Sequence, residues 1–155
     1  FKKDARCRRQ VRAAFGAEVL TKEGVDRGKL GRIVFGNRKA LEKLEGIVHP
    51  LVKGRIEEIL RTSRARITVL DVPLLIEAGW AKMVNVLIVV KAGRKIQLER
   101  LQKRTGLSRG EIMKRLKRQM PEKEKVKYAD MVIDNRRSFA DTDKQVQKIW
   151  DLLTK

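Results

Sequence analysis

Arginine and glutamine side chains recur in the second half of this sequence at a spacing that suits phosphate binding. Gln97, Arg100 and Arg104 are three and four residues apart, so a helix would carry them on one face. Arg115 and Arg118 follow on a second predicted helix. Guanidinium groups pair with phosphate oxygens in a fixed geometry, and phosphoryl transfer needs positive groups around the transferred phosphate. The array predicts a phosphoryl-transfer site; the alternative is a basic face whose arginines pair with glutamates of the same helices.

A carboxylate ends an apolar run in the middle of the chain. Residues 65–71 are rich in β-branched residues and predict a buried strand that ends at Asp71, since Pro73 has no amide hydrogen for a ladder. Ligands of open α/β sheets bind at the carboxyl ends of strands. Asp71 is therefore a candidate to hold Mg²⁺ through water or to activate an attacking hydroxyl. A structural carboxylate that caps backbone amides is the alternative.

Three further polar residues are candidates with plainer alternatives. Glu77 follows Asp71 by six residues and either points into the same cleft or lies on a helical turn. His49 is the only histidine; at a helix junction before proline it is an acceptor-site candidate or a structural cap. Asn135 follows the last predicted strand and suits either a base-contacting loop or a simple turn.

The net charge of the chain is +19, from 38 Lys and Arg against 19 Asp and Glu. Such an excess implies a polyanionic partner, which leaves a basic nucleic-acid-binding or interaction module as the alternative function. Against that alternative, acidic residues are mixed in throughout, only seven residues are aromatic (two Trp, one Tyr and four Phe), and no nucleic-acid motif is present. No specific nucleic acid is therefore expected.

Cysteine content and hydropathy restrict the class of protein further. The single cysteine, Cys7, excludes a disulfide framework and fits a reducing cytoplasm, which is the expected location. No apolar run approaches the length of a membrane span, so no membrane partner is expected. The oligomeric state is not readable from these features.

Helical and strand patterns alternate in the second half of the chain. The first part is predicted to be helical, with a loop or weak hairpin at 17–27, an N-cap at Asn37, and a helix break at His49-Pro50. Continuous apolar strands are then predicted at 65–71, 84–90 and 131–134, with helices predicted at 95–105, at 110–119 and after Ser138. This alternation predicts an α/β fold with a parallel sheet.

Four segments taken in order resemble a known family. They are His49-Pro50, DVPLLIE at 71–77, Gln97 with the arginines that follow it, and ADMVIDN at 129–135. The sequence resembles dephospho-coenzyme A kinase, a P-loop kinase of the nucleoside-monophosphate-kinase type. The resemblance implies that ATP and Mg²⁺ are used to phosphorylate the ribose 3′-hydroxyl of dephospho-CoA, the last step of coenzyme A synthesis.

The resemblance also implies a division of the chain. Residues 1–63 would form a helical subdomain that binds the acceptor. Residues 64–155 would form the remainder of the P-loop-kinase core, with a helical lid at about 100–127.

Matching positions give the expected site residues. Asp71 would lie at the cleft floor, and Asn135 would lie near the adenine. Arg100, Arg104 and Arg115 would belong to the lid over the ATP phosphates.

Two departures from the family pattern affect these expectations. Arg136 and Arg137 stand where the family usually has a small residue, and the 155 residues contain no G-x-x-x-x-G-K-[ST] loop for nucleotide phosphates. We therefore expect a fragment: an incomplete three-layer fold whose parallel sheet lacks its central strand, with the general base in the absent segment. Such a chain is expected to be inactive and poorly stable alone. A degenerate pseudo-kinase is the alternative.

Overall fold

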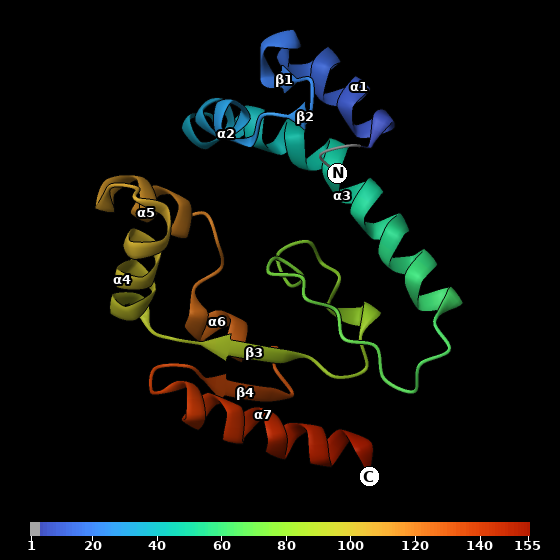
Figure 1. The fold of residues 1–155 in the computed structure, drawn as a ribbon, viewed down its shortest axis with the longest axis vertical. Helices are drawn as coiled ribbons and strands as arrows, with labels where there is room; N and C mark the ends of the chain where they lie inside the picture. Colours follow the sequence, from blue (N-terminus) through green and yellow to red (C-terminus); the bar gives the residue numbers. More distant parts are fainter. Residues whose placement is uncertain (1–3) are drawn as a thin grey trace. The chain divides into compact units, whose positions relative to one another are not determined.

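The structure, a computed structural model, describes residues 4–155 (Figure 1). The chain divides into two compact units, Phe1–Asp71 and Val72–Lys155. Helices make up most of the first unit, whereas the second combines helices with a parallel strand pair. The predicted mixed α/β class is therefore confirmed.

The described part of the first unit, residues 4–71, contains three helices, a 3₁₀ turn and a short antiparallel hairpin. They are α1 (Ala5–Phe15), η1 (Ala17–Val19), β1 (Leu20–Thr21), β2 (Gly24–Val25), α2 (Arg27–Gly36) and α3 (Arg38–Thr62). Each helix begins at a side chain that accepts a backbone N–H: Asp4 caps α1, Asp26 caps α2 and Asn37 caps α3. Of the loop or weak hairpin predicted at 17–27, the structure shows the hairpin, and the cap predicted at Asn37 is confirmed.

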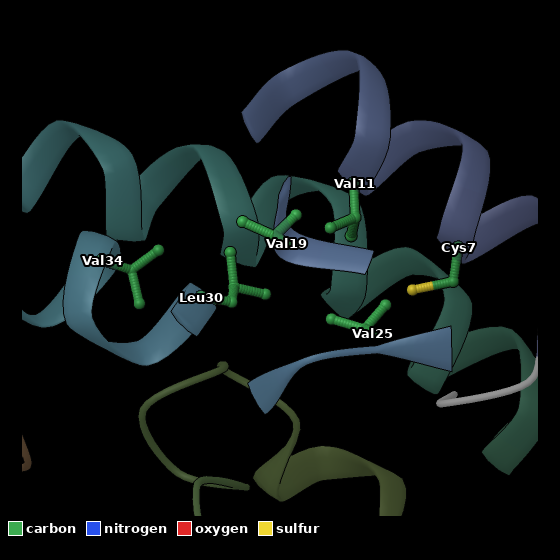
Figure 2. Close-up of a cluster of buried hydrophobic side chains, with 6 residues drawn as sticks. All are labelled: Cys7, Val11, Val19, Val25, Leu30 and Val34. Atoms are coloured by element: carbon green, nitrogen blue, oxygen red, sulfur yellow. The ribbon is translucent and has the colours of Figure 1, made fainter. Parts of the chain in front are cut away.

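A cluster of buried apolar side chains holds the first unit together (Figure 2). Its members come from α1, η1, β2 and α2 and are Cys7, Val11, Val19, Val25, Leu30 and Val34. Val19 is fully buried, and Val11 is 1% exposed. Because α3 packs partly buried residues against the same cluster, all three helices of the unit share one core.

The predicted helix break at His49-Pro50 is wrong. Helix α3 runs without interruption from Arg38 to Thr62, with Pro50 inside it. Proline removes the bond to the carbonyl four residues earlier and usually kinks or ends a helix. Here Leu44 and Ile47 before the proline, and Leu51 after it, pack on one core cluster. Tertiary packing on both sides of Pro50 therefore outweighs its local cost.

The predicted strand at 65–71 is also wrong. Within residues 4–155 the strands form only the pairs β1–β2 and β3–β4, and residues 65–71 pair with neither. Residues 65–71 belong to no helix or strand, and Val69 is 80% exposed. An extended segment becomes a strand only when a neighbour takes up its backbone groups. Apolar composition predicts the tendency of this segment to pair, but it does not supply a partner.

The second unit is built around two parallel strands. Its elements are η2 (Ala81–Met83), β3 (Ile88–Lys91), α4 (Arg94–Thr105), α5 (Arg109–Leu116), α6 (Glu122–Val126), β4 (Met131–Asp134) and α7 (Phe139–Thr154). Strands β3 and β4 pair in parallel from Ile88↔Met131 to Lys91↔Asp134, and α7 packs against β4 (Figure 1). The strand predicted at 131–134 is confirmed, whereas the one predicted at 84–90 is present only from Ile88.

Helices of the second unit begin and end at residues that are typical helix caps. Helices α4 and α5 meet at Gly106, which adopts a left-handed conformation with φ 66°. Capping boxes begin α5 at Ser108 and α7 at Ser138. No helix within residues 4–155 has the length and hydropathy needed to span a bilayer.

Candidate functional site

The carboxyl ends of β3 and β4 meet at one edge of the sheet, where ligands of parallel sheets bind. Glu122, the first residue of α6, lies at this edge, and its carboxylate accepts hydrogen bonds from three donors. Its Oε2 atom accepts the backbone N–H groups of Ala92 (2.9 Å) and Gly93 (3.0 Å) and the side-chain amide of Gln97 (3.3 Å). The turn between β3 and α4 is therefore held by a carboxylate from α6.

Asn135 follows β4 at the same edge. Its backbone N–H donates to the Lys91 carbonyl at 2.7 Å, which extends the ladder by one residue. Its side-chain oxygen accepts the Thr142 hydroxyl of α7 at 3.1 Å. Asn135 thus follows β4 directly and is fixed between the sheet and α7.

Asp134 and Arg136 form an ion pair beside Asn135. The Arg136 Nε–H donates to both carboxylate oxygens of Asp134 at 2.9 Å. These hydrogen bonds to Arg136 lower the pKa of Asp134 to about 2. Arg136 also lies near Gly93, because a Cβ on that glycine would sit 3.8 Å from the Arg136 Cδ. Arg136, which stands where the family usually has a small residue, therefore lies beside the β3–α4 turn that Glu122 holds.

Of the predicted array, Gln97, Arg100 and Arg104 lie on α4 and Arg115 lies on α5. The placement of Arg118 on the second helix is wrong, because α5 ends at Leu116 and Arg118 lies in the turns that follow it. Arg100 and Arg104 are exposed, and within residues 4–155 no ion pair joins either of them to a carboxylate. Glu111 bonds to Ser108 instead: its Oε2 accepts the Ser108 N–H at 3.0 Å and hydroxyl at 2.7 Å. Hydrogen bonds from Ser108 lower the pKa of Glu111, and the nearby charge of Arg115 adds to the effect. Arg100 and Arg104 thus retain guanidinium groups that an anion can approach.

Glu77 lies in a series of turns and is tied to α6. Its Oε1 atom lies 2.8 Å from the Lys125 ammonium and accepts the Met120 N–H at 3.2 Å. Lys125 also donates to the Pro73 carbonyl at 3.3 Å. Glu77 thus lies in a turn, and its carboxylate holds Met120 and Lys125 on either side of the start of α6.

The two remaining candidates belong to the first unit. Asp71 is exposed at the end of that unit, and His49 is half-buried within α3. No group of three or more His, Cys, Asp or Glu residues within 4–155 is arranged to hold a metal ion. Magnesium is commonly held by one or two carboxylates together with substrate phosphates, so the single carboxylate of Asp71 fits a magnesium ion that arrives with a nucleotide.

Comparison with known proteins agrees with this geometry. The family model described as dephospho-CoA kinase matches residues 1–141. The chain belongs to the dephospho-CoA kinase family. A relative named dephospho-CoA kinase from Geobacter metallireducens is 45% identical over 147 residues, which cover 92% of this chain and 73% of the relative. One from Aquifex aeolicus is 43% identical over 148 residues, which cover 94% and 75%. The chain spans about three quarters of the length of such relatives.

Solved structures show the same fold. The crystal structure of TT1252 from Thermus thermophilus matches with a TM-score of 0.76 and 33% identity, over 95% of this chain and 76% of that one. Dephospho-CoA kinase from Campylobacter jejuni matches with a TM-score of 0.61 and 31% identity, over 93% and 74%. The resemblance to dephospho-CoA kinase that the motifs indicate is confirmed. The prediction that the protein is a kinase that uses ATP is confirmed with it. The nucleic-acid-binding alternative is not favoured.

Sequence reasoning missed Glu122. It stands in the stretch PEKEKVK, where alternating acids and lysines are typical of a solvated surface. Nothing in that pattern separates Glu122 from Glu124, which pairs with Lys127 three residues on. The two glutamates differ only in the folded chain, where the side chain of Glu122 reaches the β3–α4 turn and that of Glu124 does not.

Proposed function

We propose that this protein transfers the γ-phosphate of ATP to the ribose 3′-hydroxyl of dephospho-CoA. The observation that carries the proposal is the match of the dephospho-CoA kinase family over residues 1–141. The site geometry supports it, since among residues 4–155 neither Arg100 nor Arg104 forms an ion pair, and both lie on α4, the helix that follows β3 at the carboxyl edge of the parallel sheet.

In this proposal Arg100, Arg104 and Arg115 bind the ATP phosphates. Negative charge spreads over the oxygens of the transferred phosphoryl group, and fixed positive groups stabilise it more in the transition state than in the ground state. The segment at about 100–127, which includes α5, would act as the lid. Its corner at Gly106 and its capped start at Ser108 support a rigid helical hairpin rather than an irregular loop.

Asp71 is proposed to lie at the cleft floor and to bind Mg²⁺ through water. When bound, Mg²⁺ neutralises phosphate charge. The exposed position of Asp71 leaves its carboxylate available to solvent and ligand, and Val72-Pro73 after it limits the ways in which the backbone can turn.

Residues 1–63 are proposed as the acceptor-binding subdomain, with His49 toward the acceptor, and residues 64–155 as the kinase core. Asn135 is proposed to lie near the adenine. The fixed position of Asn135 at the carboxyl end of β4 supports that role, as does the glycine turn beside it.

We further propose that the complete parallel sheet has one more, central strand, which would lie beside β3. Strand β3 pairs only with β4 among the described residues, and Val90 on β3 is 56% exposed. Because the 155 residues contain no G-x-x-x-x-G-K-[ST] loop, a phosphate loop of that kind would have to come from outside them. The chain by itself is therefore expected to be inactive.

The test is an assay of coenzyme A formation from ATP, Mg²⁺ and dephospho-CoA. It uses the protein expressed from its complete coding sequence, here called the full-length protein, and the 155-residue chain in parallel. We expect product only from the full-length protein. Turnover by the 155 residues alone would contradict the proposed missing strand but would support the proposed reaction.

A further inference from the structure

We propose that Glu122 is a positioning residue, whose carboxylate holds the turn between β3 and α4 and so fixes the direction of the arginine face on α4. The identity of the anion that this face binds rests on the proposed function. The mechanical role of Glu122 does not.

The geometry of the turn shows why a carboxylate is needed there. Gly93, immediately before α4, has φ +74° and provides no side chain to cap the helix. The Glu122 Oε2 atom instead accepts the N–H groups of Ala92 and Gly93, at 2.9 and 3.0 Å. Both bonds are charge-assisted and partly buried, and such bonds are stronger than neutral ones. A negative charge at this end of α4 also suits the helix dipole.

The third bond of Glu122 sets the rotation of α4 about its own axis. Gln97, which donates to Oε2 at 3.3 Å, is the first member of the array and shares its face with Arg100 and Arg104. Fixing Gln97 toward α6 therefore also fixes where the two arginines point. A helix held only by its backbone turn would lack this constraint.

The carboxylate can act in this way only if α6 is itself held. A five-residue helix is not stable alone. Lys125, three residues after Glu122, pairs with Glu77 at 2.8 Å and donates to the Pro73 carbonyl at 3.3 Å. Helix α6 is thus attached both to the turns after Pro73 and to the base of α4.

The first test measures amide exchange by NMR in the full-length protein. Variants are Glu122→Ala, Glu122→Gln and, as a matched control, Glu124→Gln, whose parent side chain pairs with Lys127 just after α6. We expect exchange at Ala92 and Gly93 to be about tenfold faster or more in Glu122→Ala, with a smaller change in Glu122→Gln, because a neutral amide oxygen still accepts. The β3–β4 ladder should be unchanged, and so should the control. Unchanged exchange at Ala92 and Gly93 would overturn the proposal.

A second measurement links the turn to the arginine face. We expect KM for ATP to rise about tenfold in Glu122→Ala while KM for dephospho-CoA stays the same. Loss of folded protein would lower the apparent kcat and leave both KM values unchanged. Faster exchange with an unchanged KM for ATP would overturn the link to the arginines. If the parent protein forms no coenzyme A, the proposed function fails, and the exchange measurement still decides the role of Glu122.

Discussion

The carboxylate of Glu77 and the ammonium group of Lys125 lie 2.8 Å apart, and their side chains are only 20% and 18% exposed. The pair connects the turns after Pro73 to α6, across almost fifty residues of sequence. Two sequence signals that look independent, the DVPLLIE segment and a lysine-rich stretch, are therefore parts of one contact.

This pair is expected to stabilise the second unit. Replacing Glu77 by Gln or Lys125 by Met should each lower the free energy of unfolding by about 1–3 kcal/mol, since the remaining partner is left partly buried without its opposite charge. The measurement is urea unfolding of both single variants and the double variant. The pair Glu124–Lys127 serves as the comparison, because its side chains are 48% and 67% exposed. The same replacements in that pair should change the free energy of unfolding by no more than about 1 kcal/mol. Equal effects at the two pairs would argue against the role given to Glu77.

Arg100 and Arg104 are expected to bind the ATP phosphates. Replacing either by Ala in the full-length protein should raise KM for ATP or lower kcat by roughly 10- to 100-fold, which corresponds to the loss of one or two charge-assisted bonds. Lys95→Ala is the control, because Lys95 is exposed and lies half a turn away from Arg104 around α4. Steady-state kinetics with ATP varied would measure the change. A comparable loss in Lys95→Ala would indicate general electrostatic attraction instead of a defined site.

Ionisation of Asp134 is expected to contribute to stability in a specific pH range. Its pKa is about 2 in the folded chain because of the bonds from Arg136, and about 3.9 in an unfolded one. A lowered pKa gives stabilisation that is present above the unfolded value and is lost as pH falls through the folded value. The difference in Tm between the parent protein and Asp134→Asn should thus be constant above about pH 5 and shrink toward pH 2. A difference that does not change with pH would exclude the ion pair as its source.

Pro50 is expected to destabilise the long helix α3. Because Pro50 cannot donate to the carbonyl of Gly46, Pro50→Ala should raise the free energy of unfolding by about 1–3 kcal/mol. Denaturant unfolding measures this change. A loss of stability would mean that the chain needs the proline's restricted backbone at this point.

The helix boundaries in this fold were largely predictable because they depend on local chemistry. Asn37, Ser108 and Ser138 cap the helices that the sequence predicts, and these caps act within three residues. The failures have a common physical origin in contacts between distant residues. Pro50 stays helical because of packing on a shared core, and residues 65–71 do not form a strand because no strand among the described residues pairs with them.

The residues of the candidate site also divide into those predictable from local sequence and those that depend on distant contacts. Arg100 and Arg104 were predictable because helical spacing alone brings them to one face. Glu122 was not, because its three bonds reach residues 25 to 30 positions earlier in the chain. The position of Asn135 followed from its place after a predicted strand, whereas its bond to Thr142 depended on how α7 returns to β4.

The central claim is tested most directly by following the conversion of dephospho-CoA to coenzyme A by mass spectrometry, with ATP and Mg²⁺ supplied to the full-length protein. The expected product carries one added phosphoryl group at the ribose 3′ position and forms only when ATP is present. Consumption of ATP without that product, or phosphorylation at a different hydroxyl, would contradict the central claim.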